Sequence, residues 1–141
     1  MRSDPQEVPA TRWLARRPEV EGSRIGYFGA STGAAAALMA AADPSLDIAA
    51  VVSRGGRPDL AGSKLALVRA PTLLIVGGAD HPVLEWNREA ASHLLCEHDV
   101  DVVPGAGHLF EEPGALESVA HKAAGWFTPR LTESLTPSPR A

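Results

Sequence analysis

Three residues of the chain have the types and the order that nucleophilic catalysis requires. Ser31 lies in the segment GASTG, residues 29–33, which fits the pattern G-x-S-x-G. This pattern is typical of a serine on a sharp strand-to-helix turn, the nucleophile elbow. A serine hydroxyl needs a general base, usually a histidine that a carboxylate orients. Asp80 and His108 follow Ser31 along the chain and are the candidate carboxylate and base.

The elements that must position these residues are short apolar segments alternating with helical ones. The expected strands are residues 24–28, 48–52, 72–76 and 100–103, and the expected helices are residues 8–17, 33–42, 83–95 and 113–127. Such alternation predicts an α/β fold with a parallel sheet of about four strands. Ligands of these sheets bind beyond the carboxyl ends of the strands. The loops after residues 28, 52, 76 and 103 are therefore expected to form the site.

The glycines beside Ser31 are expected to be required by packing. A strained turn brings its neighbouring residues against the strand and the helix, which leaves no room for side chains at Gly29 and Gly33. The helix that follows aims its first N–H groups at the site, so that developing negative charge is favoured there.

A phosphate-binding loop is the competing interpretation of the same glycines. A Walker loop requires lysine and then serine or threonine after its second glycine, but Ala34 and Ala35 follow Gly33. A dinucleotide loop has a third glycine in the early helix, where this chain has only alanines. The tyrosine and lysine pair of short-chain dehydrogenases is also missing. A nucleotide-binding module remains a lesser alternative, and we expect no cofactor.

A metal site is not expected either. Asp80 and His81 are adjacent, but no third ligand with workable spacing accompanies them. The single cysteine, Cys96, cannot form an internal disulfide and is interpreted as a structural or incidental thiol.

Composition narrows the class of protein further. The 141 residues suit one compact domain, expected over residues 1–130 with a flexible tail at 131–141. The formal net charge is −4, and no stretch combines basic with aromatic residues, so no nucleic-acid partner is expected. No signal peptide or membrane span is recognised, which predicts a cytoplasmic protein without a membrane partner.

Four segments together resemble the C-terminal half of α/β-hydrolases of the dienelactone hydrolase-like group. They are IGYFGASTGAAAAL, VVSRGGRPDLAG, APTLLIVGGADHPVL and VVPGAGHLFEEPGAL. Similar segments also occur as a domain attached to phosphoribosyltransferases. The resemblance implies that the strands upstream of the elbow are missing, and with them one of two oxyanion-hole donors. The N–H of Thr32 is the donor that remains. Dienelactone hydrolases proper have a cysteine nucleophile where this chain has Ser31.

The expected function is that of a serine hydrolase acting on small ester or lactone substrates. Arg54 and Arg57, in the loop after the second strand, are candidate residues for binding an anionic substrate group, and solvated turn residues are the plain alternative. The alternative function is a catalytically weak or inactive α/β-hydrolase remnant or subunit that needs a partner. Because the strand at residues 24–28 is central in the complete fold, its bare edge predicts a homodimer joined there.

Overall fold

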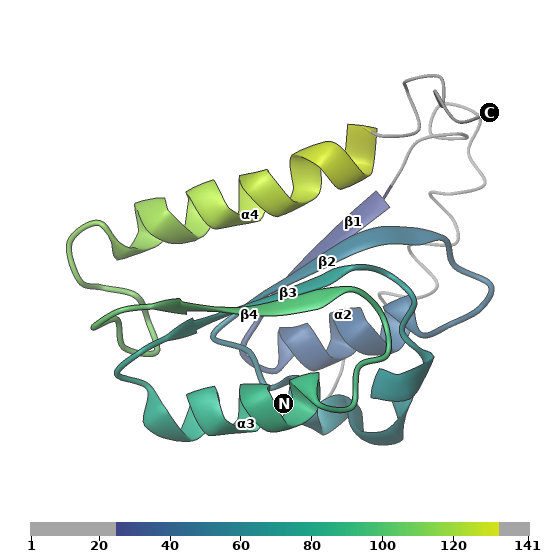
Figure 1. The fold of residues 1–141 in the computed structure, drawn as a ribbon, viewed down its shortest axis with the longest axis horizontal. Coiled ribbons are helices and arrows are strands. Elements are labelled where there is room, and N and C mark those ends of the chain that lie inside the picture. Colours follow the sequence, from purple (N-terminus) through teal and green to yellow (C-terminus); the bar gives the residue numbers. More distant parts are fainter. Residues whose placement is uncertain (1–24, 133–141) are drawn as a thin grey trace.

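The computed structural model describes residues 25–132, in which four parallel strands form one sheet with the order β1-β2-β3-β4 (Figure 1). The strands are β1 (Ile25–Ala30), β2 (Ile48–Arg54), β3 (Thr72–Gly77) and β4 (His98–Val103). The expected α/β fold with a four-stranded parallel sheet is confirmed. Residues 8–17, where a first helix was expected, lie outside the described residues.

Helices cover both faces of the sheet. The helices α2 (Gly33–Ala41) and α3 (His81–Ala91) lie on one face, and α4 (Ala115–Thr132) lies on the other (Figure 1). A 3-10 segment, η2 (Pro58–Leu67), follows β2 and contacts α2 and α3. The sequence analysis did not predict η2, which is interrupted at Gly62, where the backbone has φ +57° and is not helical.

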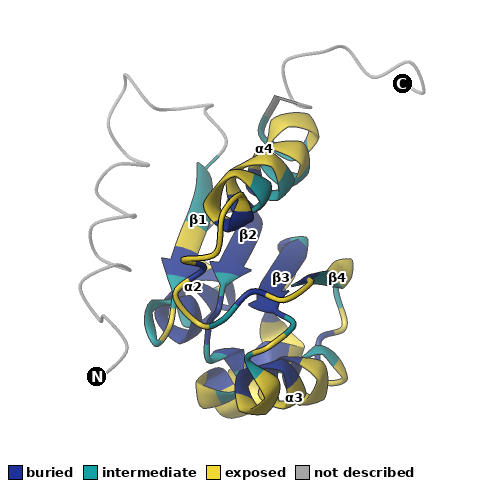
Figure 2. Ribbon diagram, turned by 90° about the vertical axis from the view of Figure 1, so that its left-hand side faces the viewer, coloured by how far each residue is buried: buried dark blue, intermediate teal, exposed yellow. Residues whose placement is uncertain are grey.

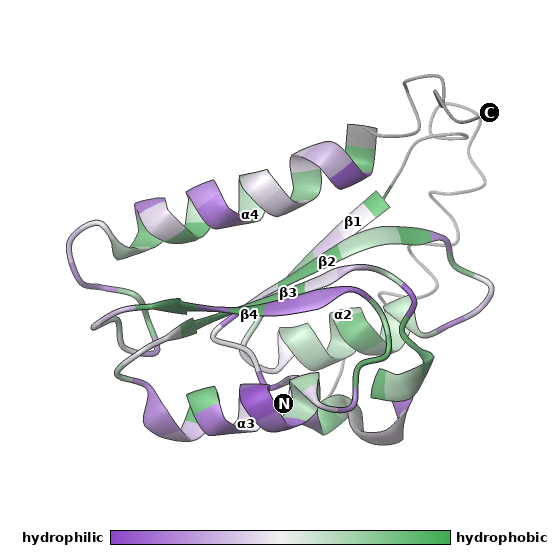
Figure 3. Cartoon of the chain, viewed as in Figure 1, coloured by the Kyte–Doolittle hydropathy of each residue, from purple (hydrophilic) through white to green (hydrophobic). Residues whose placement is uncertain are grey.

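The two central strands are apolar on both faces, as parallel strands between helical layers must be. In β2, Val51 packs in the core beside α2, whereas Val52 packs beside α4. In β3, Leu74 faces the α2 side, and Leu73 and Ile75 face the α4 side. The sheet therefore separates two apolar cores, one against α2 and one against α4. Figure 3 shows the hydrophobic residues that make up most of β2.

Alanine lets α2 lie close to the sheet. Seven of its nine residues are buried. Five of these seven are consecutive and lie in the half of the helix nearer to Ser31: Ala34, Ala35, Ala36, Ala37 and Leu38. Methyl side chains have no rotamers to lose on burial, so a helix of alanines packs closely at little entropic cost. The helix that begins just after Ser31 is in this way held firmly against the sheet.

Several boundaries differ from those expected. The strand β2 extends to Arg54, which therefore ends a strand instead of lying in the following loop. The helix α3 ends at Ala91, after which the amides of His93 and Leu94 bond to carbonyls three residues back. The helix α4 begins at Ala115, because Gly114 has φ +81° and cannot continue a helix.

The last helix continues past residue 131, where the tail was expected to begin. The helix α4 continues to Thr132 with Pro129 inside it, so residues 131 and 132 are helical. Residues 133–141 lie outside the described residues. No helix within residues 25–132 is both long and apolar enough to cross a membrane.

Among the described residues, β1 pairs with β2 alone and forms an edge of the sheet (Figure 2). In this pairing, Phe28 lies opposite Val52. The side chain of Phe28 is 49% exposed, whereas every residue of β3 is buried. The edge strand thus presents an apolar side chain as well as backbone groups.

Candidate active site

Ser31, His108 and Asp80 lie in one hydrogen-bonded row at the carboxyl ends of the strands. The Oγ of Ser31 is 3.2 Å from Nε2 of His108, and Nδ1 of His108 is 2.9 Å from Oδ2 of Asp80. An ionised carboxylate only accepts, so Nδ1 donates to Asp80 and Nε2 is left to accept from Ser31. This tautomer is the one that a general base for Ser31 requires.

Exposure differs along the row in a way that suits catalysis. Ser31 is exposed, and the side chain of His108 is 41% exposed, whereas that of Asp80 is only 14% exposed. The nucleophile and base are therefore open to a substrate, while the orienting carboxylate is shielded. Shielding strengthens the hydrogen bond that holds the imidazole ring.

Ser31 occupies a left-handed backbone conformation with φ +52°, as expected of a nucleophile elbow. A Cβ at Gly29 would lie 2.6 Å from the carbonyl oxygen of Gly33 and 2.7 Å from Cα of Ala34, so Gly29 is required. A Cβ at Gly33 would contact nothing within 4 Å. The expectation that both glycines are needed for packing was wrong for Gly33, because it begins α2 with its α-hydrogens facing open space.

Gly77 at the end of β3 brings the His108 loop to Asp80. A Cβ there would overlap the carbonyl of Ala106. Backbone bonds join the same segments, from N of Gly78 to O of Val103 at 2.8 Å and from N of Ala79 to O of Ala106 at 3.0 Å. The paired loops after β3 and β4 thereby place carboxylate and base side by side.

Phe110 anchors the His108 loop in the core. Its backbone has φ +56°, a strained value for a bulky residue, and its side chain is 1% exposed. The ring packs with buried residues of β2, β3 and α4. The favourable burial of the Phe110 ring compensates for the strain of its backbone, so the ring fixes the loop two residues after His108.

The two candidate substrate-binding arginines have different surroundings. Arg57 forms a bidentate pair with Asp59 at 2.9–3.0 Å and stacks on Trp86 at 3.8 Å from the ring centroid. The bond to Asp59 raises the pKa of the Arg57 guanidinium. Arg54 lies over Phe110 at 5.8 Å, and its buried Nε has no hydrogen-bond partner in the structure.

Thr32 is the N-cap residue of α2, directly after the nucleophile. Its backbone N–H is the oxyanion-hole donor predicted from the sequence. That role stays a prediction. Glu112 accepts a hydrogen bond from N of Gly107 at 3.2 Å and so supports the loop that carries His108.

Two further features of the site were not predicted. Gly55, at φ +53°, approaches His108, since a Cβ there would be 3.5 Å from Nδ1 of its ring. The fully buried Asn87 of α3 donates to the carbonyl of Gly56. The double glycine in SRGGRP was a sequence signal for a close approach, but no pattern distinguishes Asn87 from the solvated polar residues of its helix.

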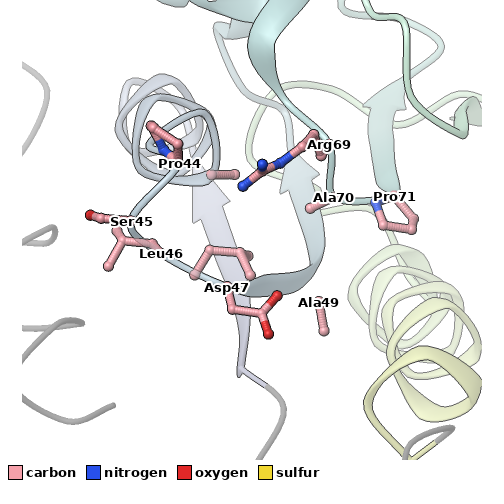
Figure 4. A pocket seen from close by; sticks show the side chains of 10 residues that line it. Pro44, Ser45, Leu46, Asp47, Ala49, Arg69, Ala70 and Pro71 are labelled. Carbon is pink, nitrogen blue, oxygen red and sulfur yellow. The ribbon is translucent and has the colours of Figure 1, made fainter. Parts of the chain in front are cut away.

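The hollow drawn in Figure 4 lies away from this row. It measures about 460 Å³ and is lined by residues before β2 and β3, among them Asp47, Arg69 and Pro71. These residues mark the amino ends of the strands, opposite the end that carries Ser31. Within residues 25–132, no group of three or more histidine, cysteine or acidic side chains is arranged to hold a metal ion.

The profile of the Dienelactone hydrolase family matches residues 4–135, and the chain belongs to that family. Among solved structures, the dienelactone hydrolase from Anabaena variabilis is similar, with a TM-score of 0.86 and 53% identity over 89% of this chain. A CIB-like hydrolase from Thermoplasma acidophilum, 21% identical with a TM-score of 0.66 over 84% of the chain and 56% of its own, shares the fold.

The curated relatives bear a different name. Two Mycobacterium tuberculosis proteins called "Putative phosphoribosyl transferase", from strains CDC 1551 and H37Rv, are each 58% identical over 124 residues, or 88% of this chain. This chain covers 28% of those proteins and 58% of the Anabaena hydrolase.

Proposed function

We propose that this chain is a serine hydrolase that cleaves small esters or lactones with Ser31 as nucleophile. The observation that carries the proposal is the unbroken row from Ser31 through His108 to Asp80, at 3.2 and 2.9 Å. Membership of the dienelactone hydrolase family supports hydrolysis as the class of reaction. The phosphoribosyl transferase name belongs to proteins of which this chain matches 28%.

In the proposed reaction, Oγ of Ser31 attacks the ester carbonyl carbon while its proton passes to Nε2 of His108. The carbonyl oxygen becomes an oxyanion, which the N–H of Thr32 and the N-terminus of α2 stabilise. His108 then gives its proton to the departing alkoxide, which leaves as an alcohol. Water, deprotonated by His108, releases the acid from Ser31 in the second half of the reaction. Asp80 stays ionised and holds the imidazolium.

Labelling with a fluorophosphonate probe tests the assignment of Ser31. The probe should modify Ser31, and the rate should fall toward acid pH, where a protonated His108 cannot accept the serine proton. Ser31→Ala should abolish labelling, while Ser63→Ala, an exposed serine in η2, serves as the matched control. Labelling of Ser31→Ala at the parent rate would overturn the assignment.

The three residues should also behave as one unit in p-nitrophenyl acetate hydrolysis. Ser31→Ala and His108→Ala should remove nearly the same activity, because neither residue works without the other. Asp80→Asn should cost less, since the base remains in place. Activity in His108→Ala that equals the parent's would argue against this triad.

A second candidate function is a hydrolase unit that needs a partner for full activity. The observation favouring it is the β1 edge, which has no second neighbour among the described residues. One oxyanion donor fewer typically costs about 10²–10³ in rate. Weak labelling that rises with protein concentration would favour this candidate over an inactive remnant, which should show no labelling at any concentration or pH.

Arg54 is the better placed of the two candidate substrate-binding arginines. It ends β2 beside Ala30, the residue that precedes Ser31. Its guanidinium has no ion pair with any described residue, whereas Arg57 is already neutralised by Asp59. An anionic group on the substrate would give the Arg54 guanidinium an ion-pair partner, which residues 25–132 do not provide.

A further inference from the structure

Asn87 is a buried polar residue that the proposed reaction does not use. It is 0% exposed, and its Nδ2 donates to O of Val83 at 2.7 Å and to O of Gly56 at 3.0 Å. Val83 is one turn back on the same helix, but Gly56 is 31 residues away. With the amide turned over, Oδ1 would face two carbonyl oxygens, so the donor assignment is secure. Asn87 therefore ties α3 to the loop after β2.

That loop, Gly55–Arg57, is here called the bridging loop because it contacts both the nucleophile and the base. The amide of Arg57 donates to the carbonyl of Ser31 at 2.9 Å. At its other end, Gly55 lies against His108 and Phe110, and its amide donates to O of Ile75 at 2.7 Å. The bridging loop is packed tightly, since a Cβ at Gly56 would overlap Ser53 and Ala34.

The bond from Arg57 to Ser31 has a specific effect on the oxyanion donor. The carbonyl of Ser31 and the N–H of Thr32 belong to one planar trans peptide, so they point in opposite directions. A donor that fixes the carbonyl direction therefore fixes the N–H direction too. Ser31 itself is at φ +52°, a conformation that persists only where its surroundings impose it.

We propose that Asn87 is a positioning residue that orients the Ser31–Thr32 peptide through the bridging loop. The inference rests on the proposed function for its kinetic consequence. Asn87 holds the carbonyl of Gly56. The amide of the same peptide, from Arg57, donates to the carbonyl of Ser31 at 2.9 Å, and the amide of Ala34 donates to that carbonyl at 3.2 Å. The shorter bond, from the bridging loop, is the one by which Asn87 aims the Thr32 N–H at the forming oxyanion. The side chain of Arg57 adds a second tie to α3 through its stacking on Trp86.

Asn87→Ser isolates the bond to the bridging loop. A serine hydroxyl can still bond to the carbonyl one turn back on its own helix but is too short to reach Gly56. We expect kcat for p-nitrophenyl acetate to fall about tenfold with KM nearly unchanged, because the lost interaction acts on the transition state. The pH dependence should keep its midpoint, since the His108–Asp80 pair is untouched.

Two further variants separate positioning from general destabilisation. Asn87→Leu, which fills the site and removes the unpartnered Oδ1, should lower kcat by a similar factor. Leu94→Ala, a buried residue just after α3, weakens the fold without contacting the bridging loop and should keep kcat per folded molecule. The kcat values of the variants are compared after correction for the folded fraction. If both Asn87 variants have the same kcat as Leu94→Ala, the proposal is overturned.

Amide hydrogen exchange tests the same chain of contacts without any activity. In Asn87→Ser, the Arg57 amide should exchange about tenfold faster than in the parent, while the Val51 amide, bonded to O of Pro71, should not change. Unchanged protection of Arg57 would overturn the role of Asn87 even in an active enzyme. If the parent chain is neither labelled by the fluorophosphonate nor able to hydrolyse p-nitrophenyl acetate, the proposed function is overturned. Faster exchange of the Arg57 amide in Asn87→Ser would in that case still support the contact between Asn87 and the bridging loop.

Discussion

Gly77 lies directly beneath the carbonyl of Ala106, so close that no side chain fits between the end of β3 and the His108 loop. The two residues after Gly77, Gly78 and Ala79, donate backbone hydrogen bonds to the carbonyls of Val103 and Ala106. The separation of Asp80 from His108 is thus set by contact between two backbones rather than by the two side chains themselves.

Gly77→Ala should therefore separate the base from its carboxylate. The added methyl group displaces the loop that carries His108, and a shift of about 1 Å in a catalytic group can cost about 10² in rate. The measurement is kcat for p-nitrophenyl acetate. Gly125→Ala is the matched control, because a Cβ there meets nothing within 4 Å and alanine favours a helix by about 0.5–1 kcal/mol. Full activity in Gly77→Ala would contradict the close contact.

Cys96 should be a poor nucleophile that takes no part in catalysis. Burial raises the pKa of its thiol, and its Sγ lies 4.0 Å from Oγ1 of Thr72, at the amino end of β3. A raised pKa leaves less thiolate at neutral pH than an ordinary thiol has, so alkylation by iodoacetamide should be slow at pH 7 and accelerate as pH rises. Hydrolysis should survive alkylation. Stoichiometric inactivation would instead indicate a cysteine nucleophile.

Arg54 should discriminate between charged and neutral esters. We expect Arg54→Gln to lower kcat/KM for p-nitrophenyl hemisuccinate by roughly tenfold or more, since a hydrogen bond to a charged group contributes about 1.5–3 kcal/mol. The value for neutral p-nitrophenyl acetate should change little. Arg69→Gln is the control, because that arginine lies at the amino ends of the strands, away from Ser31. Equal losses on both esters would remove Arg54 from the substrate-binding residues.

The edge formed by β1 should drive self-association near residues 24–28. Light scattering at micromolar concentration should report a dimer or larger species, because an apolar strand that has only one neighbour among the described residues is a template for another chain. Phe28→Lys should shift the population toward monomer by placing a charge at the edge. Leu116→Lys on α4 replaces an equally exposed apolar residue away from the edge and should not. A stable parent monomer would refute the prediction.

Local patterns were enough to predict the sheet and the three residues that form the hydrogen-bonded row. The segments around Val51 and Leu74 are continuously apolar, as parallel strands buried on both faces require. In any parallel sheet the residues that follow the carboxyl ends of the strands lie at the same edge, whatever the details of packing. For that reason Ser31, Asp80 and His108 were recognisable from order alone.

The contacts that hold the row together were not predictable in the same way. Asn87 contacts Gly56, and Phe110 packs against Val52 and Ile75, which are all more than twenty positions away along the chain. Contacts between such distant residues produce no periodic pattern in a single sequence. The end of β2 was misplaced because Ser53 and Arg54 are polar, although the strand continues through both. Pairing with Leu74 and Ile75 of β3 overrides their low strand preference.

The order of strands in the sheet is the order of strands in the described chain, so β1 and β4 are the outermost of the four. Ser31 follows β1 and His108 follows β4, and the loop after β4 therefore passes Gly77 and Gly55, beyond the ends of β3 and β2, to bring His108 to Ser31. The reach of this one loop sets whether the base meets the nucleophile, and shortening the loop would draw His108 away from Ser31 while leaving both strands intact.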